Sequence, residues 1–165
     1  MPLAPSAAPA VIDLPALASL IPLLAARGYE VIGPVVRDAA VVYDVVEKLE
    51  DLPAGWTDEQ DAGRYRLVQT GGPEVFGYTV PAQSCKRYLH PPEVLVFDGL
   101  RDNGDFRIVP PVPITTKYAF LGVRPCDVAA IAVQDRVFLA DRYLERGYNV
   151  RRSNALIIAA NCTRA

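Results

Sequence analysis

Three cysteines and a single histidine are the side chains of this 165-residue chain best suited to nucleophilic or metal chemistry. Cys85, Cys126 and Cys162 are odd in number and widely spaced, with no C-x-x-C pair and no Cys/His box. This spacing argues against a disulfide framework and favours a reducing compartment, the cytoplasm. Cys126 and Cys162 each follow an apolar run by a few residues, and thiolates in such positions are candidate ligands for zinc or an iron-sulfur cluster.

We expect Cys126 and Cys162 to lie at one edge of a parallel sheet. Residues 118–123 and 155–160 are uniformly apolar, as in strands buried on both faces, and residues 126–139 carry apolar side chains at helical spacing. Strand, helix and strand predict a β-α-β unit, and ligands of such sheets gather outside the carboxyl ends of the strands. Two thiolates would supply half of the four ligands that zinc or an iron-sulfur cluster takes from a protein.

The rest of the chain predicts an α/β fold with an N-terminal helix, antiparallel hairpins and the C-terminal β-α-β unit with its parallel strands. The helix spans residues 13–27, with Asp13 as its N-cap, a kink at Pro22 and Gly28 after its end. Residues 29–36 pair with 41–46, and 64–69 pair with 75–80, as two hairpins. We further expect an acidic loop over 47–63, a short helix over 83–89, a strand over 93–98, a polar loop over 98–105 and a polar helix over 141–147. Residues 1–12 are expected to be a flexible Pro/Ala leader, and 13–165 a single domain that forms the N-terminal part of a longer iron-sulfur protein.

Charge and hydropathy exclude several classes of partner. The formal net charge is −2, the sequence pI is near 5.4, and basic residues never form a run longer than two, so we expect no nucleic-acid partner. The apolar N-terminal run has no basic residue before Arg27 and is interrupted by Pro15 and Pro22. It therefore predicts neither a signal peptide nor a membrane span.

Five stretches carry a resemblance to a known family: GYEVIGPVVRD (28–38), DLPAGWTDEQDAGRYRL (51–67), SCKRYLHPPE (84–93), FLGVRPCDVAAIAVQDRVFL (120–139) and NALIIAANCTRA (154–165). Their most specific pieces are D-x-Q-x-x-G-x-Y-R-L (58–67), R-P-C-D (124–127) and N-C-T (161–163). Together they resemble the N-terminal region of the 4Fe-4S dicluster proteins, the family of the sulfhydrogenase beta subunits and of the corresponding subunits of anaerobic sulfite reductase.

The resemblance implies the N-terminal scaffold of a 4Fe-4S electron-transfer subunit in a hydrogenase- or sulfite-reductase-like redox complex. Cys126 and Cys162 would bind part of one cluster, and Arg124 and Asp127 would tune it from alongside. A ferredoxin-like, Cys-rich continuation would follow N-C-T in the family, so the sequence is expected to be truncated before that part. The implied partners are catalytic and flavin- or nucleotide-binding subunits, and no catalytic site is expected within residues 1–165.

Each of these residues also has a plainer interpretation. Cys126 and Cys162 could be small core side chains of a non-redox α/β interaction module, and Arg124 and Asp127 could form an ion pair and an N-cap where the helix starts. A nucleophile and base dyad of Cys126 and His90 is a third hypothesis. Cys85 is expected to be structural under all three.

Overall fold

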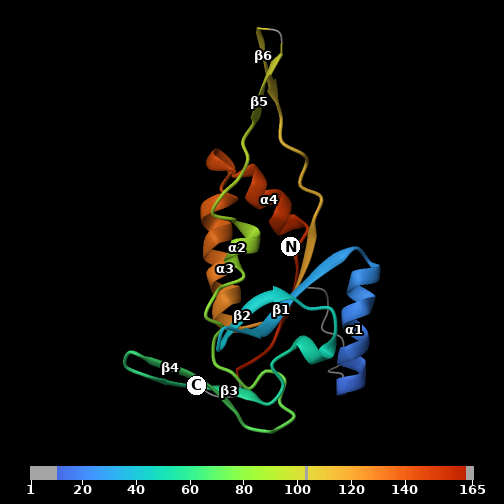
Figure 1. Cartoon of the computed structure of the whole chain (residues 1–165), viewed down its shortest axis with the longest axis vertical. Coiled ribbons are helices and arrows are strands. Elements are labelled where there is room, and N and C mark those ends of the chain that lie inside the picture. The colour runs from blue at the N-terminus through green and yellow to red at the C-terminus, as the bar shows by residue number, and fades with distance from the viewer. Residues whose placement is uncertain (1–10, 103, 163–165) are drawn as a thin grey trace.

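A mixed four-stranded sheet is the centre of the α/β fold that the computed structural model describes for residues 11–102 and 104–162 (Figure 1). Its strands are β1 (Tyr29–Arg37), β2 (Ala40–Val45), β7 (Lys117–Val123) and β8 (Leu156–Ala159), in the order β2-β1-β7-β8. The β1 strand pairs antiparallel with β2 and parallel with β7, and β7 pairs parallel with β8. The predicted first hairpin and the predicted parallel pair are therefore confirmed, and they share one sheet.

Helices cover both faces of this sheet (Figure 1). On one face lies α1 (Leu14–Ala26), and on the other lie α2 (Lys86–Leu89), α3 (Pro125–Phe138) and α4 (Arg146–Ser153). The predicted start of α1 is confirmed, since the Asp13 carboxylate accepts a hydrogen bond from the Ala16 amide at 2.9 Å. The predicted end is confirmed as well, because Gly28 follows it with φ of +80°.

Apolar side chains form one core on each face of the sheet. The core under α1 contains Ile21, Leu24, Val31, Val35, Val46, Leu52, Val75, Ala119 and Leu121. The core under α3 and α4 contains Ile32, Tyr43, Cys85, Leu89, Phe120, Val123, Ile131 and Tyr148. Strands β1 and β7 contribute to both cores, as expected of strands with helices on either side.

The β7 strand changes face near its carboxyl end because of a bulge at Gly122. Residues alternate between the two faces of a strand, so Ala119 and Leu121 reach the α1 core and Phe120 the opposite one. Val123 should then join the α1 core, yet it lies in the core under α3, because the pairing register with β8 shifts between Leu121 and Val123. Gly122 has φ of +75° at this point.

Two separate two-stranded ribbons replace elements that the sequence predicted differently. The first joins β3 (Trp56–Asp61) to β4 (Arg64–Gln69). The predicted loop over 47–63 is therefore wrong, since a 3-10 turn, η1 (Leu49–Asp51), and β3 occupy it. The predicted pairing of 64–69 with 75–80 is wrong too. The ribbon is largely exposed on both faces, so its sequence lacks the alternation that marks a half-buried strand.

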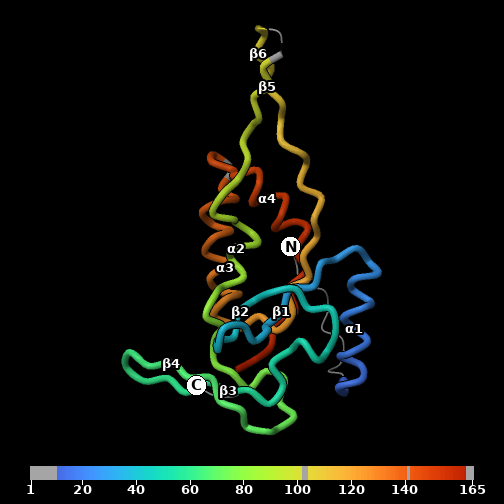
Figure 2. Tube along the Cα trace, in the orientation of Figure 1, coloured from blue at the N-terminus to red at the C-terminus, as the bar shows by residue number. Residues whose placement is uncertain are grey.

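The second ribbon joins β5 (Asp98–Asp102) to β6 (Asp105–Val109) and projects away from the sheet (Figure 2). Residues 93–97 carry no regular structure, so the predicted strand over 93–98 and the predicted polar loop over 98–105 are both wrong. The short helix predicted within 83–89 is confirmed by α2, and the helix predicted from 126 to 139 by α3.

The remaining expectations concern the C-terminal segment, the N-terminal leader and membrane-spanning helices. The helix predicted over 141–147 is wrong, because a 3-10 turn, η2 (Asp141–Tyr143), precedes α4. The β8 strand exists as predicted but is an edge strand and only half-buried. Residues 1–10 of the expected leader lie outside the described residues. Within the described part of the chain, none of the helices is both long enough and apolar enough to cross a bilayer.

Candidate functional site

The carboxyl ends of β7 and β8 bring the two predicted cysteine ligands to neighbouring segments of one sheet edge. The strands are tied together past their last paired residues, since the Ala160 amide donates a hydrogen bond to the Val123 carbonyl at 2.9 Å. Cys126 then lies in the first turn of α3, and Cys162 follows Ala160 by two residues. Both thiols are exposed, so both are accessible to a metal ion or a cluster from outside.

Arg124 lies between these two segments and is fully buried, with 0% of its surface exposed. Its guanidinium donates to the carbonyl of Asn161 at 3.3 Å, next to Cys162, which ties the segment after β8 to the start of α3. It also donates to the carbonyls of Phe76 and Tyr78 and lies over the Tyr78 ring, 4.4 Å from its centroid. The loop around residues 76–78 is thereby held against the sheet edge.

The positive charge of Arg124 is not neutralised by any nearby carboxylate among the described residues. Across the described residues, the ion pairs within 4.0 Å are Arg37 with Asp44 and Arg152 with Asp135. The predicted ion pair of Arg124 with Asp127 is therefore wrong, although Arg124 does occupy the N-cap position of α3. Its Nε atom is buried and has no hydrogen-bond partner. A buried cation without a counterion is costly, so an anion beside this edge would be favoured.

Asp127 is held from the opposite side, in the core under α3. Its carboxylate is 9% exposed and accepts hydrogen bonds from the Tyr43 hydroxyl at 3.2 Å and from the Ser84 hydroxyl at 3.5 Å. It is the third residue of α3, where the helix dipole favours a negative charge. Burial, and then the Asp127 carboxylate, hold the pKa of Tyr43 far above its ordinary value, so Tyr43 remains a hydrogen-bond donor.

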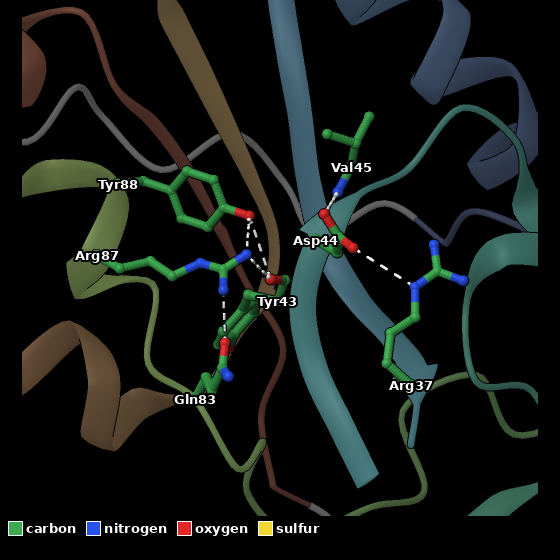
Figure 3. A network of polar contacts seen from close by, with 7 residues as sticks. All are labelled: Arg37, Tyr43, Asp44, Val45, Gln83, Arg87 and Tyr88. Atoms are coloured by element: carbon green, nitrogen blue, oxygen red, sulfur yellow. Dashed lines mark hydrogen bonds and ion pairs between the residues drawn. The ribbon is translucent and has the colours of Figure 1, made fainter. Parts of the chain in front are cut away.

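Tyr43 also fastens α2 to the sheet, as Figure 3 shows. Its carbonyl accepts hydrogen bonds from Arg87 and from the Tyr88 hydroxyl, each at 3.2 Å. Arg87 in turn donates to Gln83 at 2.6 Å and to the Tyr88 hydroxyl at 2.9 Å. The segment that carries Cys85 is thus fixed between β2 and α3.

Cys85 and His90 lie away from the sheet edge. Cys85 is fully buried, and burial followed by the nearby Asp127 charge raises the pKa of its thiol to about 11, so it is a poor thiolate donor. His90 stacks on Phe138 with ring centroids 4.7 Å apart. Phe138 ends α3 whereas Cys126 lies in its first turn, about 18 Å along the axis at 1.5 Å per residue. The predicted Cys126–His90 dyad is therefore wrong.

The described residues suit an iron-sulfur cluster only as a partial ligand set. Exposed thiols beside a buried, uncompensated arginine match the soft, anionic character of such a cluster. Nevertheless, no group of three or more His, Cys, Asp or Glu side chains within residues 11–102 and 104–162 could hold a metal. Cys126 and Cys162 are thus at most two of the four protein ligands that such a cluster takes.

Sequence reasoning missed the residues that hold Arg124 in place. The sequence predicts Phe76 and Tyr78 in a hairpin strand, whereas their carbonyls bind the guanidinium from an irregular loop. The one sequence feature that points to this arrangement is Arg124 itself, a charged residue directly after the apolar run 118–123. Carbonyl acceptors leave no mark on side-chain identity, so their positions could not be found from the sequence.

Comparison of this chain with protein-family models, with curated proteins and with solved structures finds no match in any of the three.

Proposed function

We propose that this chain is the N-terminal scaffold of an iron-sulfur electron-transfer subunit, in which Cys126 and Cys162 supply two thiolates of one 4Fe-4S cluster. The observation that carries the proposal is the placement of two exposed thiols just beyond two neighbouring parallel strands whose ends are tied together by hydrogen bonds. When bound, a cluster of this kind takes up and releases single electrons.

Arg124 and Asp127 would adjust such a cluster by their charge. A cluster held by thiolates becomes more negative on reduction, so the buried Arg124 guanidinium favours the reduced form and Asp127 opposes it. Arg124 also fixes the main chain on either side of the two thiols, through Asn161 after β8 and through its own place at the start of α3. This chain would therefore position and tune the cluster without carrying out a reaction on a substrate.

The proposed setting is a redox complex of the hydrogenase or sulfite reductase type, whose other members are catalytic and flavin- or nucleotide-binding subunits. These partners rest on the family resemblance, because no described feature identifies them. Three free cysteines, two of them exposed, support a reducing compartment, the cytoplasm.

The test is the metal content of the polypeptide as the cell makes it, purified without oxygen. Each of the variants Cys126→Ala and Cys162→Ala is expected to lower iron and acid-labile sulfide by about four atoms per chain, which is one cluster. Electron paramagnetic resonance of the reduced protein should lose one signal in parallel. The matched control is Cys85→Ala, which removes a buried thiol and should leave iron and sulfide unchanged.

Unchanged iron in both exposed-cysteine variants, with the control also unchanged, would refute the proposal. The non-redox interaction module with structural cysteines would then take its place.

A further inference from the structure

The β5–β6 ribbon and the two segments leading to it form an arm, residues 94–102 and 104–112, that is unusually apolar for an exposed structure. Figure 2 shows the arm reaching away from the sheet and its helices. Val96 is 74% exposed and Phe106 66% exposed, and most other large apolar side chains of the arm are open to solvent: Val94, Leu95, Phe97, Leu100, Ile108 and Val112. Exposed apolar side chains gathered on one projecting segment are typical of a protein interface.

The ribbon also has two open strand edges. Strands β5 and β6 pair with each other and belong to neither of the other sheets in the described part of the chain. An isolated two-stranded ribbon is marginally stable in water, and unpaired edges are templates for a further strand. A partner that adds strands to these edges would therefore stabilise the ribbon.

The sequence of β6 is self-complementary when two copies run antiparallel about Phe106. Directly opposite residues in that arrangement are Phe106 with Phe106, and Asp105 with Arg107 of the second copy, twice by symmetry. Centring the pair on Asp105 or on Arg107 instead would place two like charges face to face. Of the registers centred on residues 105 to 108, the one about Phe106 is the one that sets opposite charges face to face. This complementarity favours a second copy of this chain as the partner.

In such a contact, one face of the ribbon would supply charge pairs and the other aromatic contacts. Asp105 and Arg107 lie on one face and Phe106 on the other, because side chains alternate along a strand. The Phe106 ring already lies over Gly99, where an added Cβ would come within 2.8 Å of it. Pairing two copies would bring the two exposed Phe106 rings together above the glycines and set the charge pairs below.

We propose that this protein forms a twofold symmetric dimer in which the β6 strands of two copies pair antiparallel about Phe106. The product is a four-stranded ribbon, β5-β6-β6-β5, which meets the strand number needed for a stable sheet. Closed twofold contacts are the commonest form of self-association. This dimer is independent of the proposed cluster and would form with or without iron.

The first measurement is the molar mass of the chain by sedimentation equilibrium across a dilution series. The expected result is a reversible monomer and dimer equilibrium. The Asp105→Arg variant puts arginine opposite Arg107, and Arg107→Asp puts aspartate opposite Asp105. Each should weaken the dimer about 5- to 30-fold, from two cross-strand charge pairs worth up to about 1 kcal/mol each.

Charge exchange then tests the register itself. The double variant Asp105→Arg/Arg107→Asp should recover the wild-type dissociation constant to within about twofold, because opposite charges face each other again. An equimolar mixture of the two single variants should also dimerise, since every facing pair is then of opposite sign. The matched control is Glu59→Arg, a charge reversal on the exposed β3–β4 ribbon, which should leave the dimer unchanged.

A chain that stays monomeric at every concentration would overturn the proposal. So would a dimer that keeps its dissociation constant in both single variants, or one that the mixture of singles fails to restore. Stable binding of a different protein to the arm of a monomeric chain would equally overturn it. Unfolding midpoints of all variants, expected to match the wild type in the monomer, exclude loss of the fold as the cause.

Discussion

Arg124 is a structural cation whose terminal guanidinium nitrogens donate to the main chain, while its Nε has no partner. It joins three carbonyls from two segments, one around residues 76–78 and one at Asn161. Arginine suits this position because its planar fork offers several donors in fixed directions and cannot lose its charge. The same side chain therefore shapes the sheet edge and gives it a positive character.

Replacing Arg124 by methionine should destabilise the fold by about 3–5 kcal/mol, because three carbonyls lose their donor and those of the half-buried Phe76 and the buried Tyr78 are poorly placed to bond water instead. The measurement is the free energy of unfolding in urea. Arg136→Met, an exposed change on the same helix, is the matched control and should shift it by less than about 0.5 kcal/mol. A loss below about 1 kcal/mol for Arg124→Met would show that the guanidinium does not support the edge.

At the scale of elements, the bulge at Gly122 decides which way the end of β7 points. It turns Val123 into the core under α3 and so sets the position of Arg124 and of the first turn of α3. A Cβ at Gly122 would lie 2.5 Å from the Phe76 ring. Glycine is thus required both for its positive φ and for space.

Gly122→Ala should cost about 2–4 kcal/mol of stability, the sum of a left-handed backbone at a non-glycine residue and of overpacking against Phe76. Gly28→Ala is the matched control, because Gly28 has φ of +80° but open space around its Cβ position, so only about 1–2 kcal/mol is at stake. Urea unfolding of both variants measures the difference. Equal losses of unfolding free energy would mean that the Phe76 ring moves aside without destabilising the fold.

The elements that the sequence predicted correctly are those that bury apolar side chains in one or both cores. Helices α1 and α3 carry apolar residues at helical spacing, and strands β1, β2, β7 and β8 carry apolar runs. Asp13 and Gly28 mark the ends of α1 by local chemistry. Residues 64–69 were correctly predicted as a strand, but the pairing in both ribbons was missed because exposed strands need no alternation. The candidate site was predicted in part, since the cysteine positions follow from topology, whereas the carbonyls around Arg124 depend on a loop that sequence alone does not fix.

At the scale of the molecule, buried acids with raised pKa values make the fold sensitive to alkali. Burial holds the pKa of Tyr43 and Tyr78 above their ordinary 10.0 and raises that of Cys85 from 9.0 to about 11. Above pH 9 the unfolded chain loses these protons while the folded chain keeps them. The free energy of unfolding is therefore fully retained below pH 9 and falls as the pH rises towards 11.

The expected fall between about pH 9 and pH 11 is about 3–5 kcal/mol, from up to about 1.4 kcal/mol per pH unit for each group that titrates only when unfolded. Urea midpoints across this range measure it. Tyr43→Phe removes one such group, so its fall should be about 1 kcal/mol smaller than that of the wild type. A midpoint that does not change over this range would contradict the prediction.

The strand order β2-β1-β7-β8 also sets the time course of folding. The β1–β2, β3–β4 and β5–β6 pairs join segments that are close in the chain, whereas β1 must find β7 across all the intervening residues, with Tyr29 opposite Lys117. Closing that loop costs entropy before any contact repays it, which gives the domain a high contact order and slows folding. Chains in which β7 has not yet docked would expose the apolar edge of β1, so newly made protein would be most prone to aggregate during that interval.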